Sequence, residues 1–372
     1  MKLFLAGGAV RDLLLGRPLS DRDYLVTETT RETFRAEHPS AKEVGRAFPV
    51  FLLNGIEFSF PRAAPLSEEL RSRDLTVNAL LLDDEGELVC HPRGLEDLHL
   101  RLLRPASERS LHDDPLRVFR AARFWAVLPD FSPHDELIEA MRDVARQGLL
   151  GTIAPDRVGS ETRKALAAAA PGNFLRLLSR AGCLSPWFDE FRTAGAIPAG
   201  PLPYHDTDVI EHTARVMDAL AGDPLAVWAG LCHDIGKTAT PQDQWPSHHG
   251  HDTAGAGMAE TLARRLRLPN TFVTTGLQGA RWHMVAGRYE GLRPGTKVDL
   301  LMQLHLSNTL DTVFALTRAD QDADFAHRAR RDLATILKVR LPLEQRDLKE
   351  ESGRRLRELR AQALAKATKG NN

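Results

Sequence analysis

The sequence contains few cysteines, and their spacing excludes two classes of stabilised small domain. Only three occur among 372 residues, at Cys90, Cys183 and Cys232, and no two of them form a paired metal-ligand motif. This spacing argues against both a disulfide framework and a zinc ribbon. We expect reduced thiols that are mostly buried.

The sequence also lacks a long hydrophobic run and an excess of either charge. No stretch of about 18 apolar residues is present to span a bilayer, and the start, MKLFLAGGAVRD, reaches Arg11 and Asp12 too early for a signal peptide. We therefore expect a cytoplasmic protein that contacts no membrane. The formal net charge is −1 and the pI is about 6.9, so a polynucleotide partner would have to bind a local patch.

Length and apolar spacing predict an α+β chain with several domains. The first hundred residues alternate short apolar runs with turn residues, and DDEG at 83–86 predicts a hairpin. From about residue 110 the spacing becomes helical, and a Gly/Pro-rich stretch at 194–206 marks a boundary. We predict a mixed-sheet head at 1–105, a helical neck and body at 106–200, a helical domain at 206–325 and a charged helical tail, with a solvated face, at 326–372.

The segment LAGGAVRDLLLGRPLSDRD combines a glycine turn with two carboxylates. Gly7 and Gly8 would let the backbone approach a triphosphate, and Arg11 on the following helix would face the same anion. Asp21 and Asp23 are two apart in a predicted strand, so their carboxylates point to one face. Two such carboxylates repel each other unless a cation lies between them, and Mg²⁺ suits oxygen ligands beside nucleotide phosphates. We expect catalysis by Asp21 and Asp23.

The run GGAVRDLLLGRP followed by DRD resembles the signature of the bacterial class of tRNA nucleotidyltransferases and the related poly(A) polymerases. This resemblance implies a head domain like that of polymerase β, Mg²⁺ as cofactor, and addition of nucleotides from CTP, or from CTP and ATP, to the 3′ end of tRNA. A second family signature is matched by RDLTVNAL, in which Arg73 would contact the nucleotide phosphates and Asp74 would order the neighbouring loop.

A third family signature is matched by Asp113-Asp114-Pro115-Leu116-Arg117. The resemblance implies that Asp114 and Arg117 recognise the Watson–Crick edges of the incoming base. We expect Asp114 and Arg117 to lie three residues apart on one helix, where Arg120 and Arg123 follow at further three-residue steps and extend one polar stripe. We expect all four side chains at the nucleotide.

The segment between these motifs is short. Family members that build a whole CCA end carry a flexible loop before the Arg-Asp-x-Thr motif, whereas here IEFSF leads almost directly to PRAAPLSEELRSRD. A pocket that does not rearrange after the second cytidine should stop there. We favour CC addition over full CCA addition.

A second set of polar residues lies in the helical half. Imidazoles and carboxylates bind divalent transition metals, and HDIGK with an upstream histidine resembles the HD superfamily of metal-dependent phosphohydrolases. The implied ligands of Mn²⁺ or Ni²⁺ are His212, His233, Asp234 and Asp320, with Asp322 as the alternative to Asp320. Lys237 would face the phosphate. Further histidines either extend this site or lie in solvent: His248, His249, His251 and His283.

One subgroup of the family carries such a domain, with phosphatase and 2′,3′-cyclic phosphodiesterase activities. Three other interpretations remain open: a full CCA-adding enzyme, a poly(A) polymerase, and an HD nucleotide hydrolase with a regulatory nucleotide-binding head. The sequence leaves the oligomeric state open between monomer and homodimer.

Overall fold

The computed structural model describes residues 1–372 except 20–21, 46–48, 203–205, 347–348 and 370–372. The chain divides into two compact units, one formed by residues 1–153 with 180–183 and the other by 154–179 with 184–372. This division falls at residue 153, within the predicted neck and body, and does not coincide with the boundary expected near residue 200.

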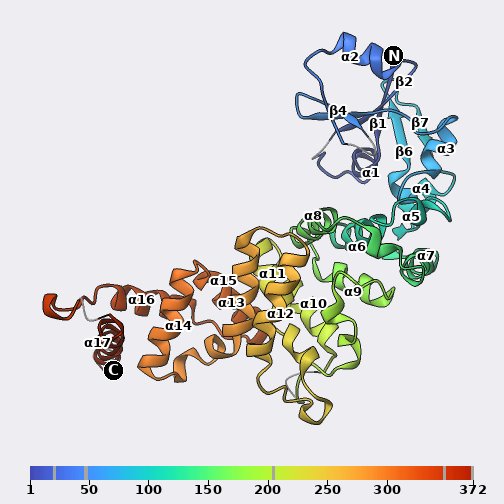
Figure 1. The fold of residues 1–372 in the computed structure, drawn as a ribbon. Coiled ribbons are helices and arrows are strands. Elements are labelled where there is room, and N and C mark those ends of the chain that lie inside the picture. The colour runs from blue at the N-terminus through green and yellow to red at the C-terminus, as the bar shows by residue number, and fades with distance from the viewer. Residues whose placement is uncertain (20–21, 46–48, 203–205, 347–348, 370–372) are drawn as a thin grey trace. The chain divides into compact units, whose positions relative to one another are not determined.

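The amino-terminal unit is built on a seven-stranded sheet with the order β3-β4-β5-β2-β1-β6-β7 (Figure 1). The pairing of β2 with β5 is parallel, and the other pairings in this sheet are antiparallel, which confirms a mixed sheet. The strands are β1 (Lys2–Ala6), β2 (Asp23–Thr27), β3 (Lys42–Val44), β4 (Val50–Leu53), β5 (Ile56–Ser59), β6 (Leu80–Asp83) and β7 (Leu88–Cys90). The predicted hairpin at 83–86 joins β6 to β7.

Alternation of apolar side chains packs the sheet on both faces. Phe4, Leu25 and Leu81 belong to one buried cluster, and Phe34 and Phe51 belong to another. The helices of this unit are α1 (Gly8–Leu14), α2 (Arg31–Glu37), α3 (Leu66–Arg71), α4 (Gly94–His99), α5 (Ser110–Asp113), α6 (Arg117–Val127) and α7 (Asp135–Arg146); two short strands, β8 (Leu102–Leu103) and β9 (Ser132–Pro133), also pair.

The described part of the second unit is helical, as predicted. Its α11 is apolar on all sides, with Val227, Trp228 and Leu231 fully buried, so it forms the centre against which α10, α13 and α15 pack. The helices are α8 (Pro155–Leu166), α9 (Gly172–Arg180), α10 (Val209–Ala219), α11 (Pro224–Cys232), α12 (His251–Arg265), α13 (Asn270–Gly287), α14 (Pro294–Leu306), α15 (Leu310–Gln321), α16 (Ala326–Leu337) and α17 (Glu350–Lys369).

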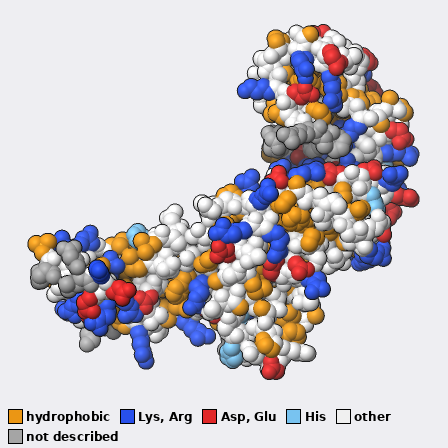
Figure 2. Space-filling model, viewed as in Figure 1, with side chains coloured by type: hydrophobic (Ala, Val, Ile, Leu, Met, Phe, Trp, Pro, Cys, Tyr) orange, Lys and Arg blue, Asp and Glu red, His pale blue; other side chains and the backbone are white. Residues whose placement is uncertain are grey.

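The predicted tail helix, α17, is charged on its outer side. Figure 2 shows basic and acidic side chains mixed at this carboxyl-terminal end, and Arg354 pairs with Glu351 while Arg357 pairs with Asp299. Leu364 is buried in the cluster formed with α14 and α16. Among the described residues, no helix has the length and apolar character needed to cross a bilayer.

Candidate active sites

The glycine turn of the first unit lies against Arg73. Gly7 follows β1 with a φ of 66°, a conformation that favours glycine. A Cβ at Gly7 would lie only 3.2 Å from Nη1 of Arg73. The Nε atom of Arg73 is buried without a hydrogen-bond partner, and the nearest Glu69 oxygen is 3.7 Å from Nη2. The guanidinium therefore has unused donor capacity beside the turn, as a phosphate site requires.

The structure describes one of the two catalytic carboxylates predicted from the sequence. Asp23 begins β2 and is exposed, whereas Asp21 lies outside the described residues. Asp23 is in register with Glu57 of the parallel strand β5. Residues in register on neighbouring strands point to the same face of a sheet, so a second carboxylate lies beside Asp23. Glu57 could not be predicted from the sequence, because the register of parallel strands leaves no local sequence signal.

Arg11 is placed differently from the anion-facing position that we expected. It is 4% exposed, and its Nη1 donates to Oδ1 of Asn78 at 2.6 Å while Nε and Nη2 donate to Asp12. Burial lowers the pKa of Arg11, an effect that Asp12 opposes. Its hydrogen bonds thus tie α1 to the segment after Arg73 and do not point into solvent.

Asp74 is a buried carboxylate that holds α6 to the Arg-Asp-Leu-Thr segment. Its Oδ2 accepts from Nε and Nη2 of Arg120, at 2.8 and 2.6 Å. Its Oδ1 accepts from the Leu75 amide and from Nδ2 of Asn78. Burial alone would raise the pKa of Asp74, but the Arg120 guanidinium holds it well below the usual carboxyl range. The Asp74–Arg120 pair therefore holds the Arg-Asp-Leu-Thr segment in place.

The expectation that Asp114 and Arg117 share one helix is wrong. Asp114 has an extended backbone, φ −142°, between α5 and α6, and its Oδ1 accepts from the Leu116 amide. The reason is Pro115, since the residue before a proline is disfavoured in the helical region. Arg117 begins α6, is buried, and donates from Nη1 to the carbonyls of Ser110 and Arg73, at 2.8 and 3.3 Å.

The expected single stripe of arginines along α6 is wrong for a related reason. Three-residue steps rotate by 300°, so successive positions drift by about 60° around a helix. Arg117 points inward, Arg120 bonds to Asp74, and the Arg123 guanidinium lies 4.2 Å from the ring centre of Phe124. Arg11 and Arg120 also lie over that ring, at 5.7 and 5.6 Å. The Phe124 ring thus contacts all three guanidinium groups, a role that the sequence did not indicate.

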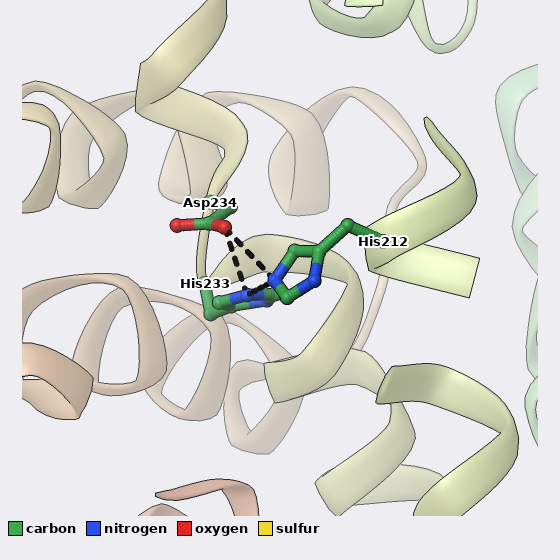
Figure 3. Close-up of side chains that lie close together, drawn as sticks. All are labelled: His212, His233 and Asp234. Carbon is green, nitrogen blue, oxygen red and sulfur yellow. Dashed lines mark hydrogen bonds and ion pairs between the residues drawn. The ribbon is translucent and has the colours of Figure 1, made fainter. Parts of the chain in front are cut away.

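The second unit brings together side chains from three helices. His212 lies on α10, while His233 and Asp234 directly follow α11, and Figure 3 shows both imidazoles turned toward the Asp234 carboxylate. The Nε2 atoms of His212 and His233 are 3.1 Å apart, and they lie 3.2 and 3.1 Å from Oδ2 of Asp234. These three residues are buried and close enough to hold a metal ion.

Asp320 completes this group from α15. Its Oδ1 is 3.1 Å from Nε2 of His212 and 3.6 Å from Nε2 of His233. The alternative ligand, Asp322, is exposed and ends α15 with a left-handed backbone. The geometry therefore favours Asp320 as the fourth member.

A hydrogen bond to the backbone orients the His233 ring. Its Nδ1 is 2.7 Å from the Gly230 carbonyl oxygen. Because a carbonyl oxygen only accepts hydrogen bonds, Nδ1 carries a proton. In the neutral ring the lone pair is then on Nε2, the nitrogen that faces the carboxylates. Burial disfavours the charged ring, yet Asp234 and Asp320 raise the pKa of His233 to about 10. The Asp234 and Asp320 carboxylates thus stabilise a positive charge at the position of the His233 ring.

Lys237, which we expected to face a phosphate, is turned inward. Its Nζ donates to Oδ2 of Asp234 at 2.5 Å and to the Ala199 carbonyl at 2.6 Å. The predicted interdomain stretch thus contributes a contact to this cluster. Lys237 balances part of the carboxylate charge.

The other histidines divide into three kinds. His251 and His283 are buried beside Oδ1 of Asp234, at 3.3 and 3.6 Å. His248 is buried too, but its ring nitrogens contact the Thr240 hydroxyl and the Pro198 carbonyl. His249 is exposed. Thus two of the four extend the cluster.

Two family models match the chain. Residues 209–321 match the HD domain, and residues 130–194 match the probable RNA and SrmB-binding site of polymerase A. A multifunctional CCA protein from Methylococcus capsulatus is 36% identical, over 98% of this chain and 94% of that protein.

Solved structures share the fold. A Thermotoga maritima CCA-adding enzyme complexed with tRNA superposes with a TM-score of 0.64 at 16% identity, covering 100% of this chain and 92% of that one. A CCA-adding enzyme with ATP superposes with a TM-score of 0.66 at 17% identity, over 98% and 87% of the two chains.

Proposed function

The chain belongs to the family of multifunctional CCA proteins, tRNA nucleotidyltransferases that carry an HD domain, and we propose that its amino-terminal unit transfers cytidylate from CTP to the 3′ end of tRNA. The observation that carries this proposal is that the exposed Asp23 begins the strand paired with β1, at the end of β1 that leads into the Gly7 turn, and that the Arg73 guanidinium beside this turn has a buried Nε without a hydrogen-bond partner. A carboxylate site and an anion site next to each other suit a nucleotide triphosphate.

Each residue has a defined task in this proposal. Gly7 and Gly8 let the triphosphate approach the backbone, and Arg73 neutralises it through its unused donor. Asp23, with Asp21 and Glu57, supplies the oxygen ligands that suit Mg²⁺. Bound there, Mg²⁺ would favour attack of the tRNA 3′ hydroxyl on the α-phosphate and departure of pyrophosphate.

Base selection is assigned to the segment that begins α6. Asp114 and Arg117 are proposed to recognise cytosine, Asp114 as acceptor and Arg117 as donor. Arg117 is held by the Ser110 and Arg73 carbonyls, so a base reader and the proposed phosphate ligand are linked directly. Arg120 and Arg123 act with Asp74 and Phe124 to position these groups.

The connection before Arg73 supports termination after two cytidines. The described residues 56–74 pass from β5 through a short bend into α3, where Leu70 and Glu69 are buried. A Glu69 oxygen accepts from the Arg62 amide at 2.8 Å. A connection held in this way does not resemble a flexible loop that refits the pocket for ATP. We therefore propose CC addition, with full CCA addition as the alternative outcome.

Replacement of one carboxylate tests the proposed transferase. Asp23→Asn should abolish incorporation of labelled CTP into a tRNA that lacks its 3′ end. Glu37→Gln, which changes an exposed carboxylate of the same unit, is the matched control and should incorporate normally. Retained incorporation in Asp23→Asn would refute this assignment.

The second unit is proposed to hydrolyse phosphate esters. His212, His233, Asp234 and Asp320 offer a mixed nitrogen and oxygen donor set that suits Mn²⁺ or Ni²⁺. Bound there, the ion would polarise a phosphate oxygen. His233→Gln should abolish hydrolysis of a 2′,3′-cyclic nucleotide while CTP incorporation persists. A head that only regulates this hydrolase would instead show no incorporation in the unmodified protein.

A further inference from the structure

We propose that the HD domain takes part in holding RNA, through a phosphate-binding surface formed by Arg267, just after α12, and Arg163, in the last turn of α8. Residues 209–321 match the HD domain and residues 130–194 match the probable RNA-binding site of polymerase A, so each matched region contributes one arginine. The inference deepens the proposed function and rests on it only for the choice of tRNA as the RNA.

The backbone after α12 forms a turn that ordinarily contains glycine. The Arg267 amide donates to the Arg264 carbonyl, and the Leu268 amide donates to the Ala263 carbonyl, each at 3.0 Å. These two hydrogen bonds form a Schellman motif, whose left-handed position favours glycine. Arg267 occupies that position with a φ of 49°. The chain therefore holds an arginine where a Cβ strains the backbone.

The side chain of Arg267 does not offset this strain by a polar contact within the fold. It is exposed, and among the described residues no carboxylate pairs with it. The neighbouring arginines differ, since Arg265 donates to both oxygens of Glu190, at 2.8 and 2.6 Å, and Arg264 pairs with Glu260. Strained residues of this kind occur where the side chain serves a ligand. We therefore assign Arg267 to a ligand.

A close helix contact brings Arg163 to the same surface. A Cβ at Gly159 of α8 would lie 2.0 Å from the Leu266 carbonyl oxygen, so the turn after α12 packs directly on α8. Arg163 lies one helical turn after Gly159 and thus on the same side of α8. Arg267 directly follows Leu266. The two arginines therefore flank one backbone contact.

The charge that remains unpaired on this surface is positive. Lys164, beside Arg163, has the Glu161 carboxylate 3.7 Å away. Arg163 and Arg267 are both exposed, and neither has an ion-pair partner in the part of the chain that the structure describes. Two guanidinium groups thus remain available to an anionic partner.

The phosphodiester backbone of RNA fits this arrangement. One helical turn and one further residue separate the backbones of the two arginines, about 10 Å, a span that phosphates of one strand can cover. Guanidinium groups bind phosphate through parallel hydrogen bonds, and such contacts position RNA without reading its sequence. We assign a tRNA that lies along α8 and continues onto the HD domain.

The test uses one substitution that removes the charge and the strain together. Arg267→Gly in the full-length chain should keep or raise the melting temperature, because glycine adopts this φ readily. It should raise the Kd for a tRNA lacking its CCA end about three- to tenfold at about 0.1 M NaCl. The slope of log Kd against log salt concentration should fall by about one. Filter binding with EDTA present measures both quantities without either proposed activity.

Three further variants serve as controls. Arg267→Lys keeps the charge and should retain most of the affinity, whereas Arg163→Gln should weaken RNA binding about as much as Arg267→Gly. Arg318→Gln, at an exposed arginine of the HD domain with Asp324 3.9 Å away, should bind tRNA as the unmodified chain does.

Two results would overturn the proposed surface. An unchanged Kd and salt slope in Arg267→Gly would leave these arginines to an acidic protein partner, and a weakened Kd together with a lowered melting temperature would indicate a loss of folding. The proposed transferase fails by a different result, the absence of CTP incorporation by the unmodified chain, so the two failures are distinguishable.

Discussion

Arg120 donates two hydrogen bonds, of 2.8 and 2.6 Å, to one carboxylate oxygen of Asp74. The pair joins α6, which begins with the proposed base reader Arg117, to the segment that carries the proposed phosphate ligand Arg73. Because Asp74 is 6% exposed, its charge depends on this partner. The geometry of the proposed nucleotide site therefore depends on a pair to which we assign no contact with the nucleotide.

Loss of Arg120 should cost more stability than loss of an exposed arginine. Arg120→Gln leaves the Asp74 carboxylate buried without its main partner, and we expect the amino-terminal unit to lose about 3 kcal/mol. Differential scanning calorimetry measures this change. Arg109→Gln, at an exposed pair with Asp113, should cost less than about 1 kcal/mol. Equal effects of the two substitutions would contradict this role.

The Asp74 pair also predicts a pH dependence of stability. The pKa of Asp74 in the folded protein lies well below its ordinary value, which is about 3.9 in the unfolded chain. The pair therefore contributes fully above about pH 4 and loses its contribution as the pH falls further, toward the folded pKa. The difference in melting temperature between the unmodified protein and Asp74→Asn should be constant from about pH 5 to pH 8 and shrink below about pH 4. A difference that grows in acid would refute the assignment.

Substitution of Gly236 should separate the two proposed activities. Gly236→Ala forces a Cβ against the His251 carbonyl and so displaces His251 from Asp234. We expect cyclic nucleotide hydrolysis to fall at least about tenfold, as when support of metal ligands is lost, with CTP incorporation unchanged. Gly257→Ala, where a Cβ on α12 meets open space, is the control and should hydrolyse normally. Normal hydrolysis by Gly236→Ala would contradict the packing argument.

The sequence predicted most of the fold because its signals were local. The alternating apolar runs, the hairpin at 83–86 and the helical spacing after residue 110 correspond to observed elements. His212, His233, Asp234 and Asp320 were also identified from sequence, and the structure brings them together. Their roles as ligands remain proposals.

The remaining features depend on contacts between distant segments. Glu57 reaches Asp23 through parallel register, and Arg120 reaches Asp74 across 46 positions. The direction of Arg11 is set by Asn78, which no helical pattern reveals. Asp114 is the exception, because Pro115 disfavours a helical conformation of the residue before it, so the break between Asp114 and α6 has a local signal in the sequence.

The central claim is that the amino-terminal unit adds two cytidines and stops. A tRNA lacking its terminal CCA is incubated with the unmodified protein and with CTP alone, ATP alone or both, and the 3′ ends of the products are sequenced. The account predicts ends that terminate at CC in both reactions that contain CTP, and no addition with ATP alone. Products ending in CCA when both nucleotides are present would contradict it.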